Sequence, residues 1–202
     1  MRFLRCGREA VLVEVDDLDA ALALYAAVRD AGLPGVVDLV PAARTVLIRL
    51  DPAVTSPAAI RFAVVDLPIG SGTRARAGAV EIPVVYDGPD LSSVASLLAV
   101  SEDDVVARHT AAEWTVAFAG FAPGFGYLVG GDWDVPRRAS PRTRIPAGSV
   151  GLAGRFSGVY PHDSPGGWQL IGRTTTVMWD LGRAEPALLL PGVRVTFRAV
   201  PA

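Results

Sequence analysis

The first third of the chain shows a strand-like run followed by a helical pattern. Residues 11–15 are rich in β-branched side chains, which favours a strand. The next apolar positions follow the helical spacing i, i+3, i+4, i+7 and are Leu18, Ala21, Leu22, Tyr25 and Val28. Asp16 or Asp17 is a candidate helix cap, and Gly32 is a stop signal. The pattern therefore predicts a strand and then an amphipathic helix.

Two more strands and a second helix follow in this part of the chain. The predicted elements are strands at 36–40 and 45–50 and a helix from Ser56-Pro57 to about Asp66. The resulting order, β-α-β-β-α, makes up most of a ferredoxin-like split βαβ motif. We therefore expect a ferredoxin-like α/β domain over residues 1–79, with a linker from about residue 67.

From residue 80 the pattern shifts toward short strands. The predicted elements are a strand at 81–86, a helix at 91–100, and a short helix that the capping box 101–104 opens and that ends at His109. Later β runs are broken by glycine and proline and lie at 113–121, 149–153, 168–172, 175–180 and 193–199. This spacing favours a compact barrel or sandwich over residues 80–202. The expected fold class of the chain is α+β.

Composition excludes several classes of protein. A hydrophobic fraction of 50% against 20% charged residues excludes a disordered chain, and 202 residues fit one large domain or two small ones. The longest unbroken apolar run, residues 20–28, is far shorter than the roughly 20 residues of a membrane span. A net charge of −2 without a basic tail gives no reason to expect nucleic acid. We expect a cytoplasmic protein that binds neither membrane nor nucleic acid.

The residue types that the chain lacks narrow the chemistry further. All 19 basic residues are arginine. Schiff-base chemistry and a Walker-type phosphate loop both need lysine and are therefore excluded. One cysteine and two distant histidines make no recognisable metal site, so we predict none in this chain.

Turn-forming residues are concentrated in the second half of the chain. Residues 120–175 hold twelve of the 21 glycines and six of the 16 prolines. They form a first tract at 120–127, a second at 141–149 and a third at 160–169. Glycine lets backbone amides approach a ligand, and loops on a β scaffold often carry function. The alternative is that a barrel needs tight corners and uses these residues to make them.

Arginine is concentrated in the same region. Between residues 136 and 175, six arginines stand against one acid, Asp163. Because guanidinium groups match carboxylate and phosphate oxygens, this charge predicts a small anionic ligand. The expected contacts are Arg142, Arg144 and Arg173. Arg137 and Arg138 are adjacent, so at most one of them need point inward. The alternative is that the arginines pair with acids elsewhere in the fold.

The histidines offer limited catalytic chemistry. His162 lies in the third tract and is the candidate acid–base residue near neutral pH, with a solvated turn residue as the alternative. His109 ends a predicted helix, where a cation suits the helix dipole. Ser164 lacks the Gly-x-Ser-x-Gly elbow of a nucleophile. Because the sequence shows no complete catalytic set, we expect the chain to be one part of a complex and to need a partner protein for activity.

The three tracts together resemble one protein family. Their sequences are Gly-Phe-Ala-Pro-Gly-Phe-Gly-Tyr-Leu at 120–128, Pro-Arg-Thr-Arg at 141–144 with Ala-Gly-Ser at 147–149, and Ser-Pro-Gly-Gly-Trp-Gln-Leu-Ile-Gly-Arg-Thr at 164–174. Members are called the B subunit of 5-oxoprolinase, the first subunit of allophanate hydrolase or kinase inhibitor KipI. The same sequence forms half of the carboxyltransferase region of urea carboxylase. Similar features at 6–14, 40–47 and 82–88 extend the resemblance over nearly the whole chain.

The resemblance implies a fold, an activity and partners. The expected architecture is an N-terminal α/β domain followed by a cyclophilin-like β-barrel at 80–202. The implied activity is ATP-dependent opening of 5-oxoproline to glutamate, with ATP used by the complex and the isolated chain inactive. The implied partners are a KipA-like C subunit, in a hetero-oligomer, and a LamB/YcsF-like A subunit. The alternatives are a KipI-like inhibitor of a sensor histidine kinase and a subunit of the allophanate hydrolase or urea carboxyltransferase type.

The same resemblance places a ligand surface on the barrel. The expected binding residues are Pro123, Gly124, Phe125, Tyr127, Arg142, Arg144, Ser164, Gly166, Gly167, Trp168, Gln169 and Arg173, and the expected catalytic residue is His162. In this interpretation Phe125 and Tyr127 form an apolar wall, the arginines hold a carboxylate or phosphate, and the third tract supplies hydrogen bonds.

Overall fold

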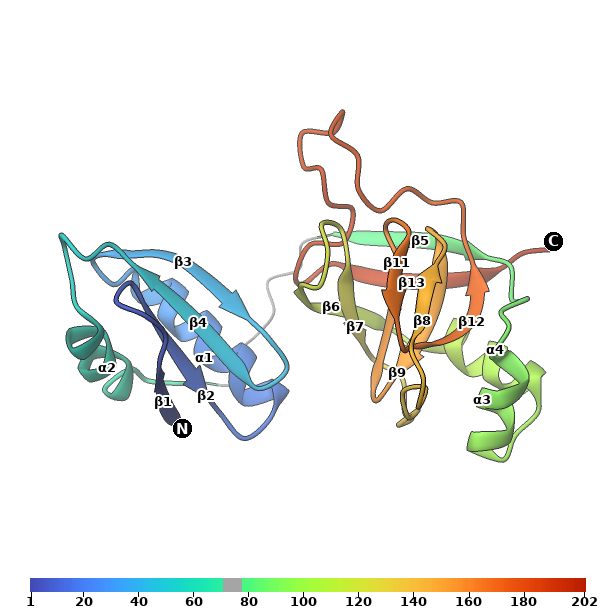
Figure 1. The fold of residues 1–202 in the computed structure, drawn as a ribbon, viewed down its shortest axis with the longest axis horizontal. Helices are drawn as coiled ribbons and strands as arrows, with labels where there is room; N and C mark the ends of the chain where they lie inside the picture. The colour runs from blue at the N-terminus through green and yellow to red at the C-terminus, as the bar shows by residue number, and fades with distance from the viewer. Residues whose placement is uncertain (71–77) are drawn as a thin grey trace. The chain divides into compact units, whose positions relative to one another are not determined.

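The computed structural model describes residues 1–70 and 78–202, and the chain divides into two compact units, residues 1–74 and 75–202 (Figure 1). Each unit has a hydrophobic core of its own. The linker that we expect from about residue 67 to residue 79 lies partly outside the described residues.

The N-terminal unit is a four-stranded antiparallel sheet with two helices. Its elements are β1 (Arg2–Arg5), β2 (Ala10–Glu14), α1 (Leu18–Ala31), β3 (Val36–Pro41), β4 (Thr45–Leu50) and α2 (Pro57–Val65). The strand order is β1-β2-β4-β3, so β4 lies between the two strands that α1 connects. The edge beside β2 is occupied by β1, which comes before it in the chain and was not predicted.

Local capping chemistry sets the helix boundaries of this unit. The Asp17 side chain accepts a hydrogen bond from the Ala20 amide at 2.8 Å, and Gly32 ends α1 with a left-handed φ of 55°. Ser56 caps α2 in the same way, through the Ala59 amide at 3.2 Å. The predicted start and end of both helices are therefore confirmed.

The C-terminal unit is a nearly closed β-barrel with two helices. Its elements are β5 (Ala79–Val84), α3 (Leu91–Leu98), α4 (Glu102–Ala111), β6 (Trp114–Ala119), β7 (Gly126–Val129), β8 (Arg142–Ile145), β9 (Ser149–Ala153), β10 (Phe156–Val159), β11 (Ser164–Gly166), β12 (Gln169–Arg173) and β13 (Arg194–Ala199). Seven strands form one sheet in the order β12-β9-β10-β7-β6-β13-β5, and β8 pairs with β11 separately. The two ends of the large sheet meet where the amides and carbonyls of Val85 and Arg173 exchange hydrogen bonds of 2.9 Å.

The helices of this unit cover part of the barrel. Residues of α4 pack on β13 and those of α3 on β12 (Figure 1). Ser101 and Asp104 form the predicted capping box at the start of α4. One strand prediction is wrong: residues 175–180 form no strand, and only Trp179 makes an isolated bridge, with Ala187. No helix within residues 1–70 and 78–202 is long and apolar enough to cross a membrane.

Candidate functional site

The first and third tracts line one cavity on the barrel, with a volume of about 460 Å³. Six aromatic side chains form most of its wall: Phe121, Phe125, Tyr127, Phe156, Tyr160 and Trp168. Small-molecule sites typically have volumes of about 300–1,000 Å³ and mostly apolar walls with a few polar groups. The cavity therefore has the size and the lining of a site for a small organic ligand.

Phe125 holds the aromatic wall together. Its ring meets Trp168 edge to face, with centroids 5.3 Å apart, and meets Tyr160 in the same way at 5.4 Å. Edge-to-face contacts place the positive edge of one ring against the negative face of another. Phe125 is itself buried, so the wall has a fixed shape rather than a set of free side chains.

Two phenol groups of this wall stay protonated at neutral pH. Burial raises the pKa of Tyr160 to about 12, although the positive charge of Arg137 opposes the shift. Burial also raises the pKa of Tyr127, again against the charge of Arg137. Both hydroxyls can therefore donate hydrogen bonds to a ligand, and the charge of Arg137 lies close to both.

Glycines allow the walls of the cavity to approach one another. A Cβ atom at Gly166 would collide with the Tyr160 hydroxyl and lie 2.8 Å from Cδ1 of Ile145. A Cβ atom at Gly158 would lie 3.0 Å from the Phe125 ring. Glycine at these two positions therefore lets the protein's own side chains come close, and the predicted approach of a glycine backbone to a ligand stays a prediction.

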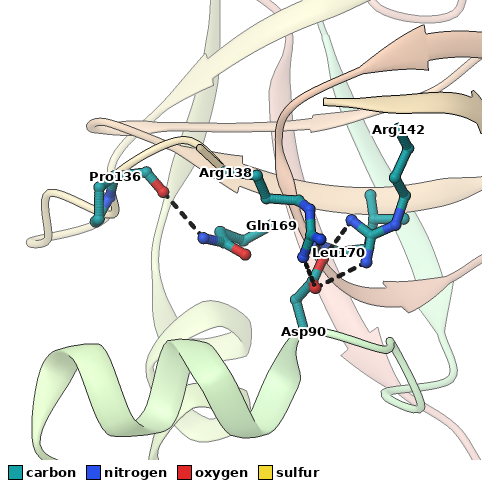
Figure 2. A network of polar contacts seen from close by, with 6 residues as sticks. All are labelled: Asp90, Pro136, Arg138, Arg142, Gln169 and Leu170. Carbon is teal, nitrogen blue, oxygen red and sulfur yellow. Dashed lines mark hydrogen bonds and ion pairs between the residues drawn. The ribbon is translucent and has the colours of Figure 1, made fainter. Parts of the chain in front are cut away.

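A buried carboxylate binds two of the arginines from the region that the sequence predicts to bind an anion (Figure 2). Asp90, at the start of α3, accepts two hydrogen bonds of 2.8 Å from the Arg142 guanidinium and one of 2.7 Å from Arg138. The Leu170 amide donates a fourth, at 2.7 Å. The four bonds join α3, β8 and β12 to the segment that contains Arg138.

The charges around Asp90 keep it ionised. Burial by itself raises the pKa of this carboxyl, but the hydrogen bonds from Arg142 and Leu170 and the charges of Arg142 and Arg138 outweigh it. The net pKa lies below the usual value. Asp90 is therefore a buried anion that two arginines neutralise.

The segment before Arg138 is fixed on both sides of Arg137. Val135 and Gly154 exchange backbone hydrogen bonds of 2.9 and 2.6 Å, and the Gln169 side chain donates to the Pro136 carbonyl at 3.2 Å (Figure 2). The Arg138 amide donates to the Gly167 carbonyl at 2.8 Å. Arg137 lines the cavity while its neighbour Arg138 binds Asp90, so only one of the two adjacent arginines faces the site.

The structure brings some of the predicted site residues to the cavity and places others elsewhere. The predicted residues that line it are Phe125, Tyr127, Gly166 and Trp168. Gly167 and Gln169 lie just behind the wall, where they fix the segment that contains Arg137. Those that do not line it are Pro123, Gly124, Arg142, Arg144, His162, Ser164 and Arg173.

The three arginines that the sequence favours as ligand contacts all have carboxylate partners within the chain. Arg142 binds Asp90, while Arg144 pairs with Asp163 at 2.6 Å. Arg173 pairs with Asp87 at 2.9 Å. The last two pairs are exposed, whereas Asp90 is buried.

Of the remaining predicted residues of the third tract, His162 lies in an exposed bend and Ser164 is buried at the start of β11. The Nδ1 atom of His162 lies 3.0 Å from the Asp163 carbonyl, and the Ser164 hydroxyl donates to the His162 carbonyl at 3.3 Å. Among the described residues no hydrogen bond joins the His162 imidazole to a titratable side chain.

Sequence reasoning missed Arg137, Asp134 and three of the aromatic residues as cavity residues: Phe121, Phe156 and Tyr160. Tyr160 and Phe121 lie within the predicted tracts, so the concentration of aromatic residues there was an available signal. Asp134 and Phe156 carried no such signal, because they reach the cavity only through the pairing of residue 135 with residue 154.

His109 is a structural residue rather than a helix-end cation. It is fully buried, its Nδ1 lies 2.7 Å from the Tyr86 hydroxyl and its Nε2 lies 2.8 Å from the Ser157 hydroxyl. Burial lowers the pKa of His109 to about 3, so the ring is neutral. The predicted charge–dipole role is therefore wrong, because a buried imidazolium would lose its solvation.

Comparison with known proteins identifies the family. The family described as Carboxyltransferase domain, subdomain C and D matches residues 1–189. The chain belongs to this family. Curated relatives 46–51% identical over 123 residues are named as the B subunit of 5-oxoprolinase. The one from Escherichia coli O157:H7 is 51% identical over 58% of this chain and 56% of its own length, so the match spans only about half of that relative.

Solved structures share the fold of the chain. A conserved uncharacterized protein from Pyrococcus horikoshii is 34% identical, with a TM-score of 0.59, over 98% of this chain and 97% of that one. The Kluyveromyces lactis urea carboxylase is 21% identical, with a TM-score of 0.80, over 98% of this chain and 22% of that one. The second likeness concerns the fold alone.

The residues around the cavity do not fit a nucleotide triphosphate or a metal ion. The charged side chains that line it are Asp134 and Arg137, one of each sign. A triphosphate needs several donors or cations to neutralise it. Residues 1–70 and 78–202 contain no group of three or more His, Cys, Asp or Glu side chains that could hold a metal.

Proposed function

We propose that this chain is the B subunit of an ATP-dependent 5-oxoprolinase, which opens 5-oxoproline to glutamate. The observation that carries the proposal is the aromatic cavity, because residues of two family tracts line it together with one arginine that has no described ion pair. The names of the curated relatives support the same activity.

The proposed complex contains two further subunits. A KipA-like C subunit would bind beside the cavity, and a LamB/YcsF-like A subunit would complete the enzyme. The absence of a complete catalytic set among the described cavity residues supports a shared site. We assign ATP to the complex rather than to this cavity, since its lining does not fit a triphosphate. The isolated chain would then have no activity.

The predicted site residues divide into three proposed roles. Phe125, Tyr127 and Trp168 would contact the ligand ring, and Gly166 would let Tyr160 approach it. Arg142, Gly167 and Gln169 would position the cavity wall. Pro123, Gly124, Arg144, His162, Ser164 and Arg173 would act only where the KipA-like partner covers them, with His162 as the acid–base residue of the shared site.

We also propose a finer description of the two units. The N-terminal sheet has the strand arrangement of a ferredoxin-like domain whose edge strand is supplied by β1 instead of a strand after α2. The C-terminal unit would be a cyclophilin-like barrel, which the nearly closed sheet supports.

Reconstitution tests the proposed activity. The purified chain is mixed with its candidate KipA-like and LamB/YcsF-like partners, and glutamate and ADP are measured after adding 5-oxoproline and ATP. Each protein is omitted in turn as a control. We expect both products in equal amounts, and neither when this chain is left out. Proteins that assemble without any turnover would overturn the proposal.

A urea-related function is the second candidate. A stretch of 65 residues is 43% identical to the urea amidolyase of Lachancea kluyveri, of which it covers only 4%. The same reconstituted complex is therefore assayed with urea and allophanate, and with a biotin carrier protein. Turnover of these substrates without turnover of 5-oxoproline would favour this second function.

A further inference from the structure

We propose that Arg137 and Asp134 are the polar contacts of the cavity and that together they select a small ring that carries both a carboxylate and a ring N–H group. Arg137 would bind the carboxylate, and Asp134 would accept a hydrogen bond from the N–H. This inference rests on the proposed function, because it assumes that the aromatic cavity is the substrate site.

Arg137 is available to a ligand, whereas four nearby arginines already pair with carboxylates of the chain. Of the six arginines between residues 136 and 175, four have carboxylate partners: Arg138, Arg142, Arg144 and Arg173. Arg155 does not line the cavity. Arg137 lines it, and within the described residues it forms no ion pair. It is therefore the cavity arginine whose guanidinium can take a ligand carboxylate through two parallel hydrogen bonds.

Hydrogen bonds hold the backbone on both sides of Arg137 in place. Hydrogen bonds hold residue 135 to Gly154, residue 136 to Gln169 and residue 138 to both Gly167 and Asp90. Binding to a residue on a fixed backbone costs less ordering entropy than binding to one on a loose loop. Asp90 is thus a positioning residue, since it holds Arg138 and so fixes the segment without touching the cavity.

Asp134 supplies the opposite charge at the same cavity. Asp134 also lines the cavity, close to Gly154, where a Cβ atom would lie 3.7 Å from its Oδ1. Within the described chain Asp134 and Arg137 do not form an ion pair with each other, although both line the same cavity. Because both side chains line the same cavity, a ligand there can offer an anion to Arg137 and a hydrogen-bond donor to Asp134.

The aromatic wall fits the rest of such a ligand. Methylene groups of a small ring can pack on the faces of Phe125 and Trp168, and a ring carbonyl can accept from the Tyr127 or Tyr160 hydroxyl. A cyclic amide acid such as 5-oxoproline has all of these groups. A ring acid without an N–H leaves the Asp134 carboxylate without its partner, and a lactam without a carboxylate leaves Arg137 without its partner.

The test compares the binding of three ligands to the full chain and to its complex with the KipA-like partner. Binding of 5-oxoproline, 2-pyrrolidinone and cyclopentanecarboxylate is measured by isothermal titration calorimetry on the full chain, alone and with the KipA-like partner. The variants are Arg137→Gln, Arg137→Lys and Asp134→Asn, with Arg198→Gln as the matched control. Arg198 is an exposed arginine of the same unit whose partner is Glu81, away from the cavity.

We expect 5-oxoproline to bind most tightly to the wild-type protein. Arg137→Gln should raise its Kd, and the KM of the complex, at least about tenfold, while leaving the binding of 2-pyrrolidinone unchanged. Arg137→Lys should restore part of the affinity. Asp134→Asn should weaken the binding of 5-oxoproline but not the binding of cyclopentanecarboxylate. Arg198→Gln should bind all three as the wild type does.

The inference and the proposed function fail in different ways. A complex that turns over 5-oxoproline with the same KM in the Arg137→Gln and wild-type forms would overturn the inference and keep the function. A chain that shows the expected binding pattern in complexes without turnover would keep the inference and overturn the function. Equal loss of 2-pyrrolidinone and 5-oxoproline binding in Arg137→Gln, or no binding to the wild type, would also overturn the inference.

Discussion

Asp90 and Arg142 face each other fork to fork, with two hydrogen bonds of 2.8 Å between residues that lie 52 positions apart. The carboxylate side chain is only 3% exposed and the arginine side chain 24%. Paired and hydrogen-bonded charges are the form in which proteins tolerate buried carboxylates. Arg142 therefore has a structural partner within the chain, and its loss should affect folding before it affects binding.

Arg142→Gln should lower the free energy of unfolding by about 2 kcal/mol. The substitution removes two charge-assisted bonds from a buried anion, although Arg138 and the Leu170 amide still hold it. Urea denaturation of the full chain, followed by fluorescence, measures the change. Arg198→Gln is the control, because its partner Glu81 is exposed and such pairs contribute less than about 1 kcal/mol. Equal effects of the two substitutions would contradict the structural role of Arg142.

Arg144→Gln distinguishes a surface ion pair from a ligand contact. The side chain of Arg144 is 77% exposed and pairs with Asp163 outside the cavity. We expect less than about 0.5 kcal/mol of lost stability and no change in the affinity of the isolated chain for 5-oxoproline. Isothermal titration calorimetry measures this affinity, and reconstituted assays across a range of 5-oxoproline concentrations measure the KM of the complex. An increase of tenfold would show that Arg144 reaches the ligand when the KipA-like partner is bound.

The helices could be predicted from the sequence because their signals are local. Asp17 and Gly32 bound α1, and Ser101 with Asp104 opens α4, each through contacts within a few residues. The strands β7, β8, β10 and β11 were not predicted. Each has only three or four residues, and β8 pairs with β11, which follows it in the chain only after β9 and β10. No local pattern of that length separates a strand from a loop.

The site could be predicted only in part, for a similar reason. The excess of arginine in this region is visible in the sequence. Which arginines are held within the fold depends on Asp90, which lies 48 residues before Arg138 and 52 before Arg142. Without that partner, Arg142 and Arg137 are equivalent as candidates. The fold separates them, since one binds a buried acid and the other lines the cavity. Phe125, Tyr127 and Trp168 could be predicted without knowledge of Asp90, because the tracts that contain them form the wall.

His109 should make the stability of the protein depend on pH. In the folded chain its pKa is about 3, whereas an unfolded histidine has a pKa near 6.5. Between these values the unfolded state binds the additional proton, so acid favours unfolding. The free energy of unfolding should fall as pH drops from about 6.5 toward 3, by roughly 1.4 kcal/mol per pH unit at most.

Urea denaturation at pH 7.0, 6.0, 5.0 and 4.5 measures this slope. His109→Gln should flatten it, since an amide can still bond to Tyr86 and Ser157 but takes up no proton. His162→Gln is the matched control, because it removes an exposed histidine of the same unit and leaves His109 in place. If the slope persists in His109→Gln, groups other than His109 cause the pH dependence.

Adjacent glycines provide the sharpest test of the cavity wall. In Gly166→Ala the new methyl group would collide with the Tyr160 hydroxyl and crowd Ile145, and both of these side chains are buried. In Gly167→Ala the nearest atom would be the Pro141 Cβ, at an ordinary contact distance of 3.6 Å. Overpacking of this kind costs about 1–3 kcal/mol, so Gly166→Ala should be clearly less stable and Gly167→Ala nearly unchanged.

The two variants should also differ in the environment of the aromatic wall. Displacement of Tyr160 moves its ring relative to Phe125, from which its centroid is 5.4 Å away, and so changes the shape of the cavity. Near-ultraviolet circular dichroism should therefore change in Gly166→Ala while the far-ultraviolet signal, which reports the backbone, stays constant. Identical near-ultraviolet spectra for the wild type and both variants would mean that the wall yields at Gly166 without moving Tyr160. The aromatic wall would then be more easily deformed than its edge-to-face contacts indicate.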